Sequence, residues 1–378
     1  MGTAKRRRVK QQSYYDYSML ILVIFIVAFG LVMVYSASSF TAQTKEKYNY
    51  DAAFFLKKQA SAALIGIFCM LAVSKYDYRR IIKPIPFVGI TKATAMYILA
   101  VILQIAVLFI GQEINGAKRW LRIGISFQPS EITKIAVILF TSYIIYRAPG
   151  AMNKLSGVIR VFIFMAVPIG LVAIENMSTA IVIGIIMVGI CYVSSKKKRY
   201  YWCSVPVIVA IGAMYIVFGE AFRMERFQIW LHVETHERGQ QILQGLYAIA
   251  SGGMFGTGLG QSMQKLGFIP EAYNDMIFAI ICEELGLFGA IVVVVLFLML
   301  IWRIFLVAVN APDLYGALIC VGVMIHIAIQ VILNICVVTN SIPSTGVPLP
   351  FISYGGTSIT ILLAEMGLVL SVSNRIGS

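Results

Sequence analysis

The chain of 378 residues is 59% hydrophobic and 13% charged, and its mean hydropathy is +0.84. This composition excludes a water-soluble globular protein, and apolar runs of about 18 or more residues recur as a multi-pass membrane protein requires. The net charge of +14 does not indicate nucleic-acid binding, because most basic residues stand in short clusters beside apolar runs.

Ten apolar segments predict membrane-spanning helices. Only helices and closed barrels satisfy their backbone groups in lipid, so the predicted fold class is an all-α, polytopic helical bundle. The expected spans are 18–38, 58–74, 94–111, 130–147, 157–174, 178–194, 202–218, 275–302, 314–337 and 355–373. A basic tail, 1–17, precedes one transmembrane domain, 18–378, which includes a large loop, 219–274, between the seventh and eighth spans.

Basic residues alternate between successive loops in the pattern that the positive-inside rule describes. With the N-terminus inside, 19 of the 31 lysines and arginines fall on the cytoplasmic side of the membrane. Both termini are therefore predicted to be cytoplasmic. The loops richest in glycine, proline and unusual polar residues then lie on the extracytoplasmic face, which is the predicted active face: 112–130, 175–177, 219–274 and 338–354.

The most unusual stretch is 267–286, GFIPEAYNDMIFAIICEELG, at the head of a long apolar run. It contains four acidic residues, Glu271, Asp275, Glu283 and Glu284. Carboxylates are costly to bury beside a membrane-length apolar segment, so they mark a functional site by default. Asp275 is the main candidate, although Asn274 and Asp275 would also suit the cap of a helix. Glu283 and Glu284 are predicted to pair with basic residues.

Several basic residues fall on the face where the positive-inside rule disfavours them, which suggests a purpose there. Lys118 and Arg119 are examples in the loop 112–130. Pro129 followed by Glu131 is a helix-start signature, and Lys134 then lies about one turn inside the membrane boundary. Lys134 either pairs with Glu131 or contacts a substrate, and the sequence leaves both open.

Two further loops on this face have special composition. Residues 338–354 carry three prolines and predict a rigid re-entrant lid. The long loop has glycines that resemble a phosphate-cradling loop, namely Gly252, Gly253, Gly256, Gly258 and Gly260. That signal is weak, because no Gly-Lys-Ser/Thr follows and no strand precedes it, although amides near a lipid phosphate remain an alternative. Deeper in the bundle, His326 is predicted to make interhelical hydrogen bonds and Glu365 to be a buried, hydrogen-bonded or protonated acid.

Three motifs occur in the order NGAKRW…FQPSE, GLGQSMQKL leading into PEAYNDMIFAIICEELG, and TGVPLPFISYGGTS. They resemble the three signature regions of the SEDS family (shape, elongation, division and sporulation) over nearly the whole chain. The start, DYSMLILVIFIVAFGLVMVYSASS, is similar to the division and sporulation branch, FtsW and SpoVE, more than to the elongation branch, RodA. The resemblance implies a peptidoglycan glycosyltransferase of the bacterial plasma membrane that polymerises lipid II into lipid-linked glycan. It also implies a class B penicillin-binding transpeptidase, and divisome or sporulation proteins, as partners.

The resemblance places the essential acid of the family on Asp275. The charge pattern and the family positions together give the expected substrate-binding residues Lys118, Arg119, Glu131, Lys134, Arg226, Lys265, Glu271, Asn274, Ser353, Tyr354, Gly355 and Ser358. The chain departs from the family pattern where Glu175-Asn176 replaces a Pro-Asp pair and where Asn340 replaces a glycine. No catalytic or metal role is expected at Asn176, because an amide replaces the carboxylate.

A mechanism follows as a hypothesis. The acceptor sugar hydroxyl must lose its proton as it attacks, and Asp275 is the candidate base. Departure of the pyrophosphate needs positive charge, with or without a divalent cation such as Mg²⁺ or Mn²⁺. The basic residues expected to supply this charge are Lys118, Arg119, Lys134, Arg226 and Lys265.

Two other function classes compete. A flippase for lipid-linked precursors would place its sites near the bilayer midplane in repeated halves, but only Glu365 and His326 are expected that deep. A scaffold that only recruits a transpeptidase would explain the sidedness, but it gives no reason for acidic and basic residues on one face. The sequence favours the enzyme.

Overall fold

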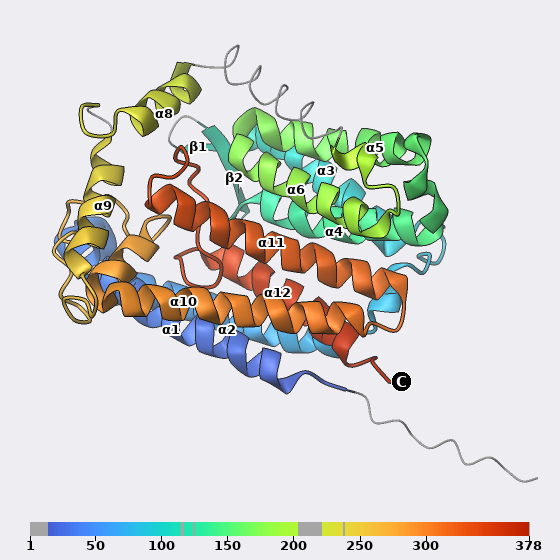
Figure 1. The fold of residues 1–378 in the computed structure, drawn as a ribbon, viewed down its shortest axis with the longest axis horizontal. Coiled ribbons are helices and arrows are strands. Elements are labelled where there is room, and N and C mark those ends of the chain that lie inside the picture. The colour runs from blue at the N-terminus through green and yellow to red at the C-terminus, as the bar shows by residue number, and fades with distance from the viewer. Residues whose placement is uncertain (1–13, 115–116, 124, 203–220, 237–238, 378) are drawn as a thin grey trace, which may run out of the picture.

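The computed structural model describes residues 14–114, 117–123, 125–202, 221–236 and 239–377, which form a bundle of long helices lying side by side (Figure 1). Within these ranges, eight helices are long and apolar enough to cross a membrane: α1 (Tyr17–Thr44), α2 (Phe54–Lys75), α3 (Lys92–Ile110), α5 (Leu155–Glu175), α6 (Met177–Ser194), α10 (Ile277–Val309), α11 (Leu314–Val338) and α12 (Gly356–Ser373). The predicted polytopic helical bundle is confirmed.

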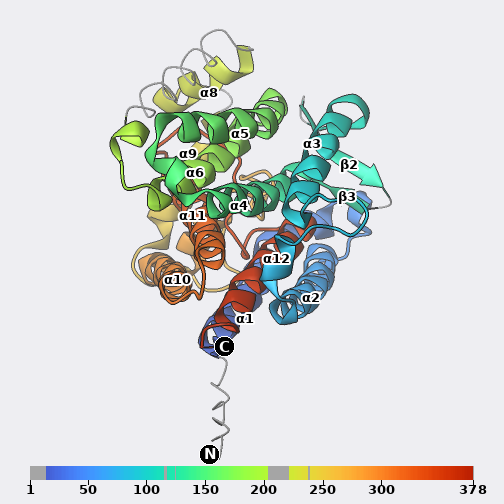
Figure 2. The same cartoon turned by 90° about the vertical axis from the view of Figure 1, so that its right-hand side faces the viewer.

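Helix α4 (Pro129–Arg147) occupies the place of the fourth expected span. Figure 2 shows it among α3, α5, α6 and α11, which it contacts. Most of its side chains are buried, including Glu131, Lys134 and Thr141. These neighbours shelter the polar side chains from lipid, so α4 can be less hydrophobic than the outer helices. The expected seventh span, 202–218, lies outside the described residues except for Trp202.

The two termini of the described chain lie together at one end of the bundle (Figure 1). The Tyr14 amide donates to the Ile376 carbonyl over 3.2 Å. Asp16 caps α1 by accepting from the Met19 amide, and it also pairs with Arg303 over 2.6 Å. A short 3-10 helix, η2 (Tyr78–Ile81), follows α2, and η3 (Pro149–Asn153) follows α4. These contacts join α1, α10 and α12 and leave the more elaborate loops to the opposite end.

We call that opposite end the loop-rich end: residues 45–53, 112–128, 221–276 and 339–355 of the described chain. It carries η1 (Glu46–Tyr48), α8 (Ala221–Leu231), α9 (Gln240–Gly252) and a small antiparallel sheet of β1 (Gln112–Ile114), β2 (Ala117–Ile123) and β3 (Ile125–Phe127). The strand order is β1-β2-β3, with Trp120 opposite Gln112 and Leu121 opposite Phe127. The all-α prediction did not include these strands. Side chains alternate along β2, so Leu121 is buried while Arg122 is exposed.

Helix α10 is broken at Gly286, where φ is 66° and ψ is −168°. The residues that fill the break belong to the glycine loop, which we define as residues 253–268. The Leu287 amide donates to the Gly253 carbonyl over 2.9 Å, and the Phe288 amide donates to the Met254 carbonyl over 3.1 Å. Backbone groups freed by the break therefore find partners in the glycine loop. The expected span 275–302 is two helical segments rather than one.

The same junction explains the glycine-rich sequence. A Cβ atom on Gly256 would lie 2.2 Å from the Glu284 carbonyl oxygen, and Gly256 has φ of +80°. The Gly258 amide donates to that carbonyl, and the Thr257 amide donates to the carbonyl of Glu283. These amides are engaged within the protein, so close packing rather than a phosphate accounts for the pattern.

We expect Gly256→Ala to destabilise the protein by about 2–4 kcal/mol, since about 1 kcal/mol of left-handed strain adds to about 1–3 kcal/mol of overpacking. Gly260→Ala is the matched control, because Gly260 has φ of +79° and open space around its Cβ position. It should cost only the strain, about 1 kcal/mol. Thermal unfolding of the detergent-solubilised variants measures both. Equal losses would contradict the close packing at Gly256.

Candidate functional site

Asp275 lies in the turn that leads into α10 at the loop-rich end, and its side chain is partly exposed. The N-cap of α10 is Met276, and no side chain caps the helix. The capping interpretation of Asp275 is therefore wrong. Asn274 instead donates its amide to the Glu271 carboxylate over 2.7 Å, which closes the turn ahead of Asp275.

The position of Asp275 is fixed by the α11 residue Asn334, which is buried. Its amide nitrogen donates to the Asp275 carbonyl over 2.8 Å and to the Val347 carbonyl over 2.9 Å. One side chain thus joins the turn of Asp275 to the last loop. A Cβ atom on Gly346 would lie 3.9 Å from Oδ2 of Asp275, so the last loop comes within van der Waals reach of the carboxylate.

Two arginines from other elements share this region. Arg226 of α8 donates to the Ser344 carbonyl over 3.2 Å and attracts the Asp275 carboxylate. Arg119 of β2 donates from Nε to the Glu175 carbonyl over 2.8 Å and lies close enough to Arg226 for their charges to repel. The structure therefore brings Asp275, Arg226 and Arg119 into one region, although Arg119 and Asp275 are more than 150 positions apart in the sequence.

The electrostatics of this group follow from its surroundings. Burial raises the pKa of Asp275 above its ordinary value and Glu271 raises it further, while Arg226 works in the opposite direction. Burial also lowers the pKa of Arg119, helped by Arg226. A carboxylate with a raised pKa beside Arg226, with Arg119 close to that arginine, suits proton transfer next to a developing negative charge.

A second group of expected site residues lies between α4 and α12. Lys134 Nζ pairs with Glu131 Oε1 over 2.8 Å, and Lys134 is only 1% exposed. Ser358 donates to the other Glu131 oxygen over 3.0 Å. The pairing alternative for Lys134 is confirmed. Deeper still, His326 Nδ1 lies 2.7 Å from Glu365 Oε2, which confirms an interhelical hydrogen bond for His326 and a buried, hydrogen-bonded Glu365.

The last loop is held in place by its expected site residues. The Ser353 hydroxyl accepts from the Leu349 amide, and the Gln59 side chain of α2 bonds to the Ser353 carbonyl and the Gly355 amide. The Tyr354 amide donates to the Tyr273 carbonyl over 2.9 Å. These contacts tie the predicted lid to α2 and to the turn that carries Asp275.

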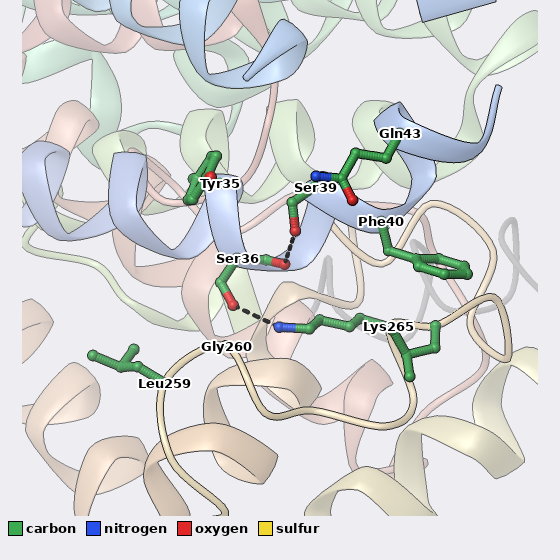
Figure 3. A pocket seen from close by; sticks show the side chains of 9 residues that line it. Tyr35, Ser36, Ser39, Phe40, Gln43, Leu259, Gly260 and Lys265 are labelled. Carbon is green, nitrogen blue, oxygen red and sulfur yellow. Dashed lines mark hydrogen bonds between the residues drawn. The ribbon is translucent and has the colours of Figure 1, made fainter. Parts of the chain in front are cut away.

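Lys265 belongs to a third group, apart from the arginines. Its Nζ lies 3.0 Å from Ser36 Oγ (Figure 3). It also lies 2.7 Å from Glu284 Oε1, so its charge already has a partner. Glu283 accepts from the Ser262 hydroxyl and from the Met263 amide. Pairing with a basic residue, predicted for both acids, is confirmed for Glu284; for Glu283 it is wrong, because backbone amides and a hydroxyl satisfy that carboxylate. A role for Lys265 beside a pyrophosphate stays a prediction.

Residues 16–376 match the model of the family described as cell cycle protein FtsW, RodA and SpoVE. The chain belongs to this FtsW/RodA/SpoVE family. It is 35% identical over 369 residues to the probable peptidoglycan glycosyltransferase FtsW of Trichlorobacter lovleyi, which covers 95% of this chain and 93% of that protein. It is also 35% identical over 367 residues to stage V sporulation protein E of Bacillus subtilis, covering 95% and 96%.

The fold of this chain also matches a solved structure. A chain from a study of how a peptidoglycan synthase complex coordinates polymerization and crosslinking superposes with a TM-score of 0.79 at 24% identity, covering 95% of this chain and 97% of that one. The predicted resemblance to FtsW and SpoVE is confirmed by the relatives, and the chain is a multi-pass membrane protein.

Three residues of this family member were not predicted as site residues. Asn334 is one of them, because a sequence does not show which backbone carbonyls its amide will meet. Gly346, in the last loop, is the second. Glu175 was noted only as a departure, yet its carboxylate accepts from the Lys118 amide over 2.7 Å and its carbonyl holds Arg119. The Lys118 side chain makes no hydrogen bond or ion pair within the described residues.

A metal site would need several ligand side chains close together. Within the ranges that the structure describes, no three His, Cys, Asp or Glu side chains gather as ligands. In the described part of the chain, the carboxylate that acts on Asp275 is that of Glu271, and its oxygen is bonded to Asn274. The side chains around Asp275 therefore do not make a complete metal site.

Proposed function

We propose that this protein is a peptidoglycan glycosyltransferase that polymerises lipid II into lipid-linked glycan. The observation that carries the proposal is the meeting of Asp275, whose pKa burial raises, with Arg226 and Arg119 at one end of a membrane bundle. The names of the relatives that match over nearly the full chain support the same activity.

The site suits a direct displacement. The acceptor hydroxyl oxygen attacks the anomeric carbon of the donor sugar, and the bond from that carbon to the pyrophosphate oxygen breaks. Asp275 takes the hydroxyl proton as the new bond forms. Its raised pKa is closer to the pH at which the enzyme works, which makes it a better general base. The pyrophosphate leaves with the bonding electron pair, and Arg226 and Arg119 stabilise its charge. Inversion of an α-linked donor gives a β-glycosidic bond.

We place the loop-rich end on the extracytoplasmic side of the plasma membrane and both termini in the cytoplasm. The distribution of basic residues supports this orientation, because Arg79, Arg147, Arg303 and Arg375 all come from the end opposite the candidate site. Lipid II presented on the outer face would then meet Asp275 directly.

A class B penicillin-binding transpeptidase is the proposed protein partner, together with divisome or sporulation proteins. The fold match to a chain of a peptidoglycan synthase complex supports this. The alternatives, a lipid-precursor flippase and a scaffold without catalysis, give no role to a base beside two arginines. The deep pair of His326 and Glu365 is the one feature that a flippase would use, and it is buried between helices.

The decisive experiment mixes purified, detergent-solubilised protein with lipid II, alone and with the native transpeptidase, and resolves glycan strands on a gel. Polymer formed without a membrane barrier is expected, and it excludes transport as the sole activity.

A divalent cation remains a further proposal. Since the side chains near Asp275 do not complete a site, Mg²⁺ or Mn²⁺ would need pyrophosphate oxygens as ligands. Adding a chelator to the same assay tests this.

We expect Asn334→Leu to lower kcat by about ten- to a hundredfold with little change in KM, because the turn of Asp275 loses its anchor. Gln330→Leu is the matched control, since Gln330 is a buried amide one turn away on the same face of α11. It should retain most activity. If both variants lost activity equally, Asn334 would act through the packing of α11 rather than through Asp275.

A further inference from the structure

The glycine loop is unusually apolar for a surface segment. Six of its large hydrophobic side chains are exposed, and Phe255 is 84% exposed: Met254, Phe255, Leu259, Met263, Leu266 and Phe268. Its one charged residue is Lys265, which is buried against Glu284. An exposed apolar patch of this kind, without exposed charge, indicates contact with a membrane or with another protein.

Helix lengths set the depth of this loop. Leu287–Val309, the part of α10 beyond the break, is about 34 Å long, slightly more than the hydrocarbon thickness of about 30 Å. Ser36, which contacts Lys265, lies about 28 Å along α1 from its first residue. Both helices therefore place the glycine loop at the boundary between the lipid chains and the headgroups on the loop-rich side.

The backbone of the loop is prepared for that environment, where unpaired amides are costly. The Thr257 and Gly258 amides donate to carbonyls at the break in α10. The Met263 amide donates to the Glu283 carboxylate over 2.9 Å. The buried acids thus supply acceptors that water would supply to an ordinary surface loop, and Lys265 balances one of their charges.

A groove of about 400 Å³ separates the loop from the last turns of α1 (Figure 3). Its walls include Tyr35 and Phe40 from α1 and Leu259 and Leu266 from the loop, while Lys265 and Ser36 meet at its floor. The ammonium of Lys265 is already paired, so the floor offers no free cation to a phosphate. The groove is also lined by the polar residues Ser39 and Gln43 of α1, but its aromatic and leucine side chains suit a hydrocarbon chain.

We propose that the glycine loop is an interfacial anchor whose apolar side chains lie among the lipid chains of the leaflet on the loop-rich side, and that the groove holds an acyl chain of a membrane phospholipid. The occupant is a phospholipid because the groove lies at the depth of the upper acyl chains. Leu287 and Phe288, whose amides bond to the start of the same loop, are themselves exposed apolar residues of a spanning helix. This anchor fixes the depth of the segment that runs from Lys265 to Asp275.

The anchor is tested by fluorescence quenching in the full-length protein, reconstituted in phosphatidylcholine–phosphatidylglycerol vesicles. The added emission of Phe255→Trp over the parent protein should be quenched by chain-brominated phosphatidylcholine, most strongly when the bromines lie near the headgroup. Glu113→Trp, at an exposed residue of β1, should be quenched little. Phe255 has few neighbours to lose, and Leu259→Trp repeats the test. Equal quenching at Phe255 and Glu113 would overturn the anchor.

The groove is tested separately. Ser39→Trp fills it from α1, and native mass spectrometry of protein extracted from phosphatidylglycerol nanodiscs should show the loss of a retained phospholipid. An unchanged lipid count would overturn this part. The proposal rests on the membrane insertion of the chain rather than on the proposed transferase chemistry. Neither readout needs lipid II, so failure here is distinct from failure of the polymerisation assay.

Discussion

Replacing Asp275 with asparagine is expected to lower the rate of lipid II polymerisation by about 10²- to 10⁴-fold, because an amide cannot take the acceptor proton. The loss should fall on kcat, since the arginines that meet the pyrophosphate remain. In the parent enzyme the rate should also fall as the pH drops through the raised pKa of Asp275, where the base becomes protonated. Purified protein, lipid II and a gel-resolved time course measure both effects.

The same substitution should not weaken the fold. The pKa of Asp275 is higher in the folded chain than in the unfolded chain, so the folded state binds this proton more tightly. The ionised carboxylate therefore disfavours folding. The contribution of Asp275 to the free energy of unfolding falls as the pH rises through its pKa in the folded chain. Asp275→Asn removes the penalty, so its thermal midpoint at neutral pH should match or exceed that of the parent, with the gain disappearing in acid.

Glu271→Gln is the control for Asp275→Asn, because it changes a neighbouring carboxylate that bonds to Asn274. It should keep most activity and shift the acid limb of the pH profile to lower pH, since one charge that raises the pKa of Asp275 is removed. Near-normal polymerisation by Asp275→Asn would refute the assignment of the base.

The second large effect is expected at Lys265. Lys265→Met leaves the buried Glu284 carboxylate without its cation, and the loss of one partner of a buried ion pair costs about 3–5 kcal/mol. The double variant Lys265→Met/Glu284→Gln removes both charges and should recover most of that loss. Thermal unfolding in detergent, compared across the parent, single and double variants, measures the coupling.

Lys57→Met is the matched control, because Lys57 pairs with Asp51 over the same 2.7 Å but is 69% exposed. An exposed pair contributes about 0–1 kcal/mol, so this variant should unfold almost as the parent does. A similar loss for Lys57→Met and Lys265→Met would show that burial of Glu284 does not set the cost.

Much of the bundle was predictable because spans of apolar residues have a fixed length in a bilayer. The sheet at 112–127 was not, since β1 and β3 are only three residues each and leave no clear period in the sequence. The break in α10 was hidden for another reason. Gly286 stands within an apolar run, and a single glycine there gives no sign that a distant loop will insert its backbone.

The candidate site was predicted in its chemistry but not in its grouping. Charge placement singled out Asp275, Arg119 and Arg226, which the fold brings together. Lys134 and Lys265 were expected beside them because all are basic and on one face. In the structure each lysine instead forms an ion pair with a glutamate, Lys134 with Glu131 and Lys265 with Glu284. A buried ammonium is destabilising unless a carboxylate lies close to it. Which acid is nearest depends on helix packing that the sequence does not display.

The attachment of α8 has a consequence for how the site comes apart. Trp230 donates to the Asn340 carbonyl over 2.9 Å, and Arg226 reaches Ser344, so α8 is fastened to the last loop from outside. Asp275 is instead tied through Asn334 into the buried core of α11. Local opening free energies follow such differences in burial. Amide protons of α8 should therefore exchange before those at the start of α10. Mild denaturant should detach α8 and Arg226 from the last loop while Asp275 keeps its position.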